Sequence, residues 1–196
     1  MTGYQNKTNK TKNQLRKALL ELLKEESITQ ISTSQIARKA ELNRVTFYRH
    51  FDDKWDILES IENDFLNQLL TPHSNLRLKL QTTHDLTATQ PAPELLVFLN
   101  VFRENLDLLK ILMASGTESN FTHRLMKQLL RLEQLSHPYL KINHSTAEKE
   151  LFSYATISSL LGMIQFWINH PEYSTKEIAD FFFKMRIGTI KELNKE

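Results

Sequence analysis

The sequence predicts an all-α fold, and three observations support this prediction. Apolar residues recur at spacings of three and four in several segments, as they do in helices with one buried face. The chain of 196 residues has only four glycines and five prolines, which disfavours a turn-rich all-β protein. Capping boxes of the form Ser-x-x-Gln or Ser-x-x-Glu begin at Ser32, Ser145 and Ser174, where we expect helices to start.

The composition excludes several classes of protein. Without cysteine, the chain has no disulfide and no thiolate metal ligand. It has no uninterrupted apolar run of about 18 residues that would span a membrane, and its polar amino terminus lacks the apolar core of a secretory signal. We find no phosphate loop, nucleophile elbow or H-E-x-x-H motif, and the seven histidines are scattered. We therefore expect a cytoplasmic protein that is not an enzyme and has no catalytic residues, metal or cofactor.

Charge is distributed unevenly along the chain. Residues 1–54 hold 11 Lys or Arg against 6 Asp or Glu, whereas residues 55–196 hold 14 against 17. A basic amino-terminal part is suited to contact with phosphate. Residues 1–11 are predicted to be a flexible basic arm that follows a phosphate backbone or enters a minor groove; the alternative is an inert tail. The next segment, from about Lys12 to Glu25, has one apolar face and predicts a helix.

Residues 31–55 predict two short helices joined by a tight turn. Ser32 and Gln35 have the spacing of a capping box for the first helix. Asn43 is the expected N-cap of the second helix, which we place at 44–50. Phe47 and Phe51 lie four residues apart, so they share one face and should be buried. The other faces then carry cationic and hydrogen-bonding side chains, a composition suited to the major groove of DNA.

Specific residues of this stretch resemble the DNA-binding helix-turn-helix of the tetracycline-repressor (TetR) family. The matching features are Ile36-Ala37, the run from Thr46 to Phe51, and Lys54 at the start of the next helix. The sequence departs from the family pattern at Glu41, where the family usually has glycine. A left-handed backbone at this position would cost a residue other than glycine about 1 kcal/mol.

Side-chain chemistry and the resemblance together predict the DNA contacts. Arg44 can donate to both acceptors of guanine, and Thr46 can touch a thymine methyl group or a phosphate. Tyr48 and His50 have polar tips suited to phosphate oxygens. The resemblance implies DNA contact at the matching positions, including Lys54. The complete predicted set is Thr33, Ser34, Arg44, Val45, Thr46, Tyr48, Arg49, His50 and Lys54.

The remaining chain predicts further helices. We assign residues 12–70 to the DNA-binding domain, with the helix-turn-helix at 32–51 and a connecting helix from Lys54 to about Leu70. Pro72 is expected to end that helix, and residues 72–93 are expected to be mostly loop, with one short helix near 76–80. Residues 71–196 form the expected ligand-binding and dimerisation domain, with helices near 95–105, 106–113, 120–135, 145–169 and 174–193.

The helices predicted at 145–169 and 174–193 are apolar on more than one face. A helix that packs on a single core needs one apolar stripe, so wider coverage indicates a second buried surface. The resemblance implies that this surface belongs to a second copy of the chain, because TetR-family proteins dimerise through their last two long helices.

The same half of the chain is rich in aromatic residues and methionine. These residues either belong to an ordinary core or line a cavity for a small molecule. Polar groups such as Asn100, Arg103 or Gln165 would orient such a ligand. The candidate lining residues are Phe98, Phe102, Met113, Phe121, Met163, Phe166 and Trp167.

The sequence therefore predicts a homodimeric transcriptional regulator that binds a palindromic operator in double-stranded DNA. The resemblance implies a repressor that a small-molecule effector releases from DNA. The alternative is a regulator or activator that a protein partner controls.

Overall fold

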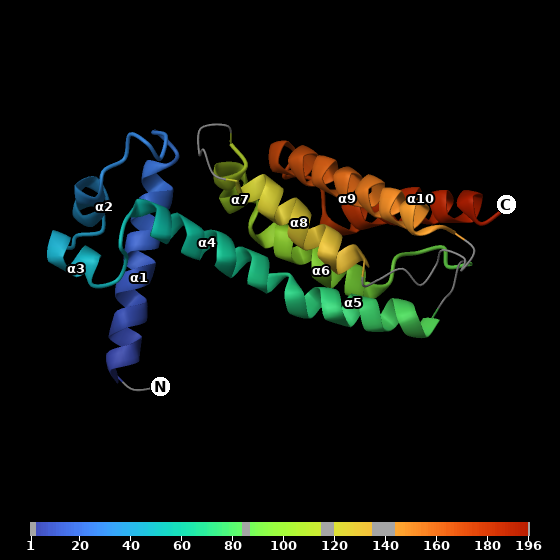
Figure 1. Cartoon of the computed structure of the whole chain (residues 1–196), viewed down its shortest axis with the longest axis horizontal. Helices are drawn as coiled ribbons and strands as arrows, with labels where there is room; N and C mark the ends of the chain where they lie inside the picture. The colour runs from blue at the N-terminus through green and yellow to red at the C-terminus, as the bar shows by residue number, and fades with distance from the viewer. Residues whose placement is uncertain (1–2, 84–86, 115–119, 135–143, 196) are drawn as a thin grey trace. The chain divides into compact units, whose positions relative to one another are not determined.

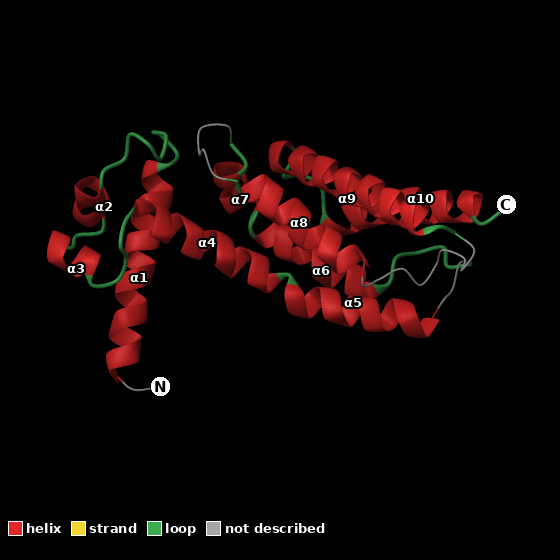
Figure 2. Ribbon diagram, viewed as in Figure 1, coloured by secondary structure: helices red, strands yellow, loops and turns green. Residues whose placement is uncertain are grey.

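The computed structural model describes residues 3–83, 87–114, 120–134 and 144–195, and all regular structure in these ranges is helical (Figures 1 and 2). The all-α prediction is therefore confirmed. Contacts divide the chain into two units. The first comprises Met1–Phe65 with Lys110–Phe121, and the second comprises Leu66–Leu109 with Thr122–Glu196.

The first unit is built around the helices α1 (Gly3–Leu22), α2 (Thr33–Lys39), α3 (Arg44–Tyr48) and most of α4 (Lys54–Gln68). Its core consists of apolar side chains that recur at helical spacing, as the sequence predicted. Arg16 on α1 pairs with Asp64 on α4 over 2.8 Å and donates a hydrogen bond to Ser60 over 3.0 Å. The buried core residues include Leu15, Leu19, Ile28, Ile36, Phe47, Ile57, Leu58 and Phe65.

Helix α1 begins at Gly3, whereas the sequence predicted that it begins near Lys12. The prediction of an arm without regular structure is therefore wrong for residues 3–11. The polar composition of this segment was misleading, because adding turns to an existing helix does not incur the cost of nucleating a new one. The Thr11 hydroxyl donates to the carbonyl of Lys7 over 3.1 Å, and the ammonium of Lys12 lies 5.5 Å from the ring centre of Phe51.

The prediction of a loop across most of 72–93 is also wrong. Helix α4 ends at Gln68, and α5 (Leu70–Thr83) begins two residues later. Pro72 lies in the first turn of α5, where a backbone N–H has no acceptor within the helix, so the missing donor costs nothing. Pro72 therefore belongs to the start of a helix rather than to its end.

The second unit contains α5, α6 (Pro93–Glu104), most of α8 (Phe121–Gln134), α9 (Thr146–Asn169) and α10 (Thr175–Leu193). Helix α7 (Leu106–Leu112) spans the division between the two units. Helix α6 packs against both α5 and α10, and α10 also packs against α9. The predicted capping boxes at Ser145 and Ser174 are both present. Trp167 is fully buried and donates from Nε1 to the carbonyl of Tyr173 over 2.8 Å, which fixes the turn between α9 and α10.

Helix α9 is the one helix among the described residues that is long and apolar enough to cross a membrane, judged by length and composition. Eight of its residues are buried, among them Phe152, Ile164 and Trp167. A core helix that carries a further apolar face has the same composition, so this feature does not by itself indicate a membrane protein.

Candidate functional site

Side-chain caps hold the two short helices of the first unit. The Ser32 hydroxyl accepts from the backbone N–H of Gln35 over 3.2 Å, and the Gln35 side chain accepts from the N–H of Ser32 over 2.8 Å. Asn43 Oδ1 accepts from the N–H of Thr46 over 2.7 Å. Both predicted caps are therefore confirmed, and they fix where α2 and α3 begin.

The turn between α2 and α3 has the left-handed backbone that glycine would favour. Glu41 has φ 57°, and its N–H donates to the carbonyl of Arg38 over 3.1 Å. The N–H of Leu42 donates to the carbonyl of Ala37 over 2.9 Å. These two bonds form a Schellman motif, which satisfies the last carbonyls of α2. The turn therefore keeps this geometry without glycine, and Glu41 bears the conformational cost.

Helix α3 buries one face and exposes the rest. Phe47 and Phe51 are buried, as the sequence predicted. Val45 is 64% exposed and Tyr48 is 47% exposed, although both are large and partly apolar. Of the other residues predicted to contact DNA, three are exposed: Ser34, Arg44 and Arg49. The remaining four are partly exposed: Thr33, Thr46, His50 and Lys54. The nine residues predicted to contact DNA are thus all accessible in the first unit, eight of them on α2, on α3 or directly after it.

Tyr48 contacts both Arg44 and Thr33 on this face. The guanidinium of Arg44 donates from Nη2 to the Tyr48 hydroxyl over 3.2 Å and lies 5.5 Å from the centre of its ring. The hydroxyls of Tyr48 and Thr33 lie 3.3 Å apart. Both hydrogen bonds lower the pKa of Tyr48, and the bond with Thr33 has the larger effect. Tyr48 therefore links α2 to α3 and holds the guanidinium on the exposed face.

Lys54 has a structural role that the sequence did not predict. Its ammonium donates to the backbone carbonyls of Thr29 and Ile31, over 3.0 Å and 2.8 Å. These carbonyls belong to the segment that leads into α2. A lysine ammonium has three donors, so two of them hold this segment and one is left for another acceptor.

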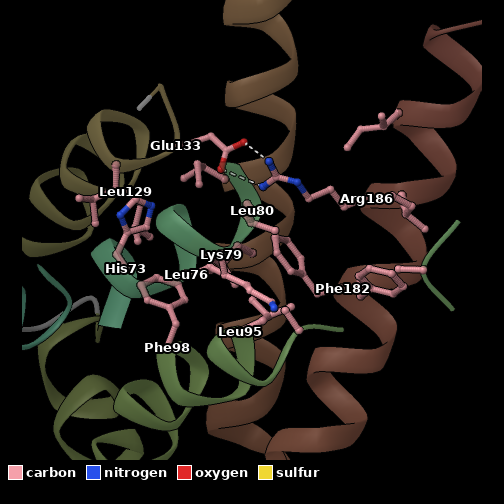
Figure 3. A pocket seen from close by; sticks show the side chains of 18 of the residues that line it. His73, Leu76, Lys79, Leu80, Leu95, Phe98, Leu129, Glu133, Phe182 and Arg186 are labelled. Atoms are coloured by element: carbon pink, nitrogen blue, oxygen red, sulfur yellow. Dashed lines mark hydrogen bonds and ion pairs between the residues drawn. The ribbon is translucent and has the colours of Figure 1, made fainter. Parts of the chain in front are cut away.

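The second unit contains a cavity of about 230 Å³ (Figure 3). Helices α5, α6, α8, α9 and α10 and residues 88–92 line it. Most of the wall is aliphatic or aromatic. The apolar lining residues are Leu76, Leu80, Ala88, Ala92, Leu95, Phe98, Leu129, Leu132, Ile157, Leu160, Phe182, Phe183, Ile187 and Ile190.

Of the seven residues predicted to line a cavity, the structure places Phe98 in this wall and the other six elsewhere. Phe102 and Trp167 are fully buried in the core. Phe121 packs against Phe65 in the first unit, with ring centres 5.8 Å apart. Phe166 is exposed and stacks on the ring of His170, with centres 4.3 Å apart. Met113 and Met163 are partly exposed and do not line the cavity.

The polar groups proposed for the cavity also differ from those observed. Asn100 accepts from the Thr175 hydroxyl over 2.6 Å, Arg103 lies 6.0 Å from the ring centre of Trp167, and Gln165 is exposed. The polar residues that do line the cavity were not predicted, because most of residues 72–93 was expected to be loop and because contacts between distant helices leave no local pattern. The polar lining residues are His73, Lys79, Gln90, Glu133 and Arg186.

Glu133 and Arg186 form an ion pair in the cavity wall (Figure 3). Nη1 of Arg186 donates to Oε2 of Glu133 over 2.8 Å, and Nη2 lies 2.7 Å from Oε1. Glu133 is 6% exposed, so the charges are largely removed from water. Losing one partner of such a pair typically costs about 3–5 kcal/mol. Burial lowers the pKa of the neighbouring His73, and the charge of Glu133 opposes this effect.

Comparison with known proteins gives a consistent result. Residues 15–61 match the sequence model of the bacterial regulatory proteins of the tetR family. A protein of Bacillus subtilis (strain 168), the uncharacterized HTH-type transcriptional regulator YxbF, is 24% identical over 164 residues. The match covers 84% of this chain but 41% of YxbF, so the chain spans about two fifths of that relative.

Solved structures share the fold over nearly the whole chain. The dihydroxyacetone kinase operon activator DhaS has a TM-score of 0.63 at 20% identity and covers 92% of this chain and 96% of its own. NalD, the secondary repressor of the MexAB-OprM multidrug efflux pump in Pseudomonas aeruginosa, has a TM-score of 0.62 at 21% identity. The match covers 96% of this chain and 97% of the NalD chain. At these identities the likeness extends to the fold alone.

Proposed function

Because the chain belongs, through the domain at residues 15–61, to the tetR family of bacterial regulatory proteins, we propose that it regulates transcription by binding specific DNA sequences. The observation that carries this proposal is the exposed face of α3. Val45 and Tyr48 are large side chains exposed beside Arg44 and Arg49, on a short helix whose other face is anchored by Phe47. Such a helix can lie in a major groove and present its side chains to the base edges.

We assign the contacts by side-chain chemistry. Arg44 reads guanine through two hydrogen bonds, and Val45 and Thr46 offer methyl groups to thymine. Tyr48 positions Arg44 and offers its hydroxyl to a phosphate. The remaining contacts are to the phosphate backbone and carry no base specificity. They involve Thr33, Ser34, Arg49, His50 and the third N–H of Lys54.

We propose that the regulator is a homodimer that binds a palindromic operator. Between Leu151 and Asn169 the sequence of α9 has no charged residue, although part of this helix is exposed. Leu151 and Tyr154 on α9 and Phe181 on α10 are exposed large side chains, and a second copy of the same surface would bury them. The two α3 helices would then read half-sites about one turn of DNA, ~34 Å, apart.

We further propose that the protein acts in the cytoplasm as a repressor and that a small molecule in the cavity of the second unit lowers its affinity for DNA. A ligand has this effect only if it binds the DNA-incompetent state more tightly than the competent state. The alternative, control by a protein partner, would use the exposed apolar faces of α9 and α10. A stable homodimer through those faces, if it is measured in solution, would argue against this alternative. The name of DhaS shows that an activator can share this fold.

Selection of bound duplexes from a random DNA pool tests the proposed function. We expect enrichment of an inverted repeat whose half-sites lie about one helical turn apart. A protein that enriches no sequence, at a salt concentration where it binds DNA, would be a non-specific binder, and the proposed function would be wrong.

A further inference from the structure

We propose that the first half of α1 binds the phosphate backbone of DNA, through Lys7 and Lys10, beside the groove in which α3 lies. This inference rests on the proposed function, because it adds a contact to the same DNA. The match to the tetR family begins at residue 15, so it covers none of this segment. The support comes from the position, the charge and the composition of this part of α1.

The first half of α1 extends beyond the core of the first unit. Residues 7–14 include no buried side chain, whereas Leu15 is fully buried. At a rise of about 1.5 Å for each residue, these residues give about 12 Å of helix outside the core. Figure 1 shows this part of α1 extending past α2 and α3. The ammonium of Lys12 lies 5.5 Å from the ring centre of Phe51, three residues after the end of α3. The extension therefore begins beside the helix that we propose enters the major groove.

The extension carries positive charge that no carboxylate on the same part of the helix neutralises. Lys7 and Lys10 are both exposed. The first acidic residue in the sequence is Glu21, so neither lysine has a carboxylate within four positions along α1. Arg16, by contrast, pairs with Asp64. Because Lys7 and Lys10 are three positions apart, they lie on the same side of the helix, and each ammonium can meet a phosphate.

The composition of the extension favours a polyanion as its partner. Among residues 3–14 only Tyr4 has a largely apolar side chain, so the sequence of this segment has no apolar stripe. A membrane surface is therefore a poor partner, because it requires an amphipathic helix. Lysines three positions apart repel each other and destabilise a free helix, whereas bound phosphates remove this repulsion. DNA is the polyanion that the neighbouring α3 meets in the proposed function.

The salt dependence of DNA binding by the full chain tests this inference. Lys7→Gln/Lys10→Gln removes both charges, and glutamine is about as good a helix former as lysine. The probes are the selected operator and a scrambled duplex of the same length. Each phosphate contact contributes about 0.9 to the slope of log affinity against log salt concentration. We expect the slope to fall by about 2 for each bound chain on both duplexes, and the ratio of the two affinities to stay within about twofold.

Lys184→Gln/Lys191→Gln is the matched control. Both lysines are exposed on α10, and replacing them changes the net charge by the same amount. The salt slope of this control should stay within about 0.5 of the wild-type slope. An equal loss of slope in both double variants would overturn the inference, because net charge alone would explain it. A loss of affinity for the operator alone would also overturn it, because a phosphate contact does not distinguish sequences.

An unchanged slope in Lys7→Gln/Lys10→Gln would likewise overturn the inference. It is the result expected if this part of α1 binds an acidic protein or has no partner.

Hydrogen exchange of the wild-type protein provides a test that needs no variant. A polar helix end outside the core frays, so its amides exchange rapidly in the free protein. Saturation with the scrambled duplex should slow exchange at residues 7–12 at least about fivefold, because bound phosphates hold these turns in place. Exchange at the same rate with the duplex bound would overturn the inference.

These measurements separate the inference from the proposed function. If the wild type does not prefer the operator, specific recognition of DNA is wrong, and the slopes on the scrambled duplex still decide the role of Lys7 and Lys10. If the wild type prefers the operator but Lys7→Gln/Lys10→Gln leaves the slope unchanged, the proposed function stands and this inference fails.

Discussion

The ammonium of Lys54, at the start of α4, donates a hydrogen bond over 2.8 Å to the backbone carbonyl of Ile31, just before α2. A second bond runs to the carbonyl of Thr29 over 3.0 Å. One side chain thus ties the first turn of α4 to the segment that positions the helix-turn-helix. The resemblance to the TetR family implies a DNA contact for this lysine, and the structure adds an anchoring role.

Replacing Lys54 by methionine should reduce the free energy of unfolding. Methionine keeps an unbranched side chain of similar length but cannot donate to Ile31 or Thr29, so we expect a loss of about 1–2 kcal/mol. Urea denaturation measures this loss. Lys176→Met is the matched control, because its surface ion pair with Asp180 should contribute less than about 0.5 kcal/mol. Equal stability of Lys54→Met and the wild type would show that the two hydrogen bonds do not anchor the segment.

Glycine in place of Glu41 should stabilise the first unit. The backbone at this position is left-handed, with φ 57°, and glycine adopts that conformation without the steric cost borne by glutamate. We expect Glu41→Gly to raise the free energy of unfolding by about 0.5–1 kcal/mol. The neighbouring Ala40 has φ −82°, so Ala40→Gly should have the opposite effect. Thermal denaturation of both variants checks the prediction, which fails if both glycines destabilise the protein.

The protein should lose stability in acid partly through His73. Burial holds the pKa of this imidazole below its ordinary value, so the unfolded chain binds the proton more readily than the folded chain. Its contribution to the free energy of unfolding is therefore complete above about pH 6.5 and is lost as the pH falls from there towards the folded-state pKa. Unfolding measured at about pH 7.5 and about pH 5.5 should show a smaller loss for His73→Gln than for the wild type. The same pH dependence in both proteins would remove His73 as a cause.

A charge on the exposed face of α10 should weaken the proposed dimer. Phe181 is 63% exposed, so Phe181→Asp should lower dimer affinity at least about tenfold without unfolding the chain. Phe182 is the wrong site for this experiment, because it is 5% exposed and lines the cavity. Val97→Asp, on the exposed part of α6, serves as the control. Sedimentation velocity measures the mass. An unchanged dimer with Phe181→Asp would exclude this face of α10 from the interface.

Local signals made most of the first unit predictable. Ser32 and Asn43 cap helices through atoms three residues away, and Phe47 and Phe51 share a face through helical spacing, so a short window contains the whole interaction. Pro72 misled the prediction because the same residue that ends one helix can begin another, and only the surrounding packing distinguishes the two.

The cavity was beyond the reach of local patterns. Glu133 and Arg186 are 53 residues apart, and neither is unusual in its own helix. Their pairing depends on how α8 and α10 pack. Phe102 and Trp167 show a second limit of local patterns. Helical periodicity predicted that both side chains are buried, but it could not predict whether a buried side chain packs in the core or lines a cavity.

The most direct test of the account is a titration of the selected operator and of a scrambled duplex with the wild type and with Arg44→Ala. Fluorescence anisotropy at fixed salt concentration measures both affinities. We predict that Arg44→Ala weakens operator binding by about 1–3 kcal/mol and leaves binding to the scrambled duplex nearly unchanged, because we propose that Arg44 contacts a base rather than a phosphate. An unchanged operator affinity, or an equal loss on both duplexes, would contradict the proposal that α3 reads DNA through Arg44.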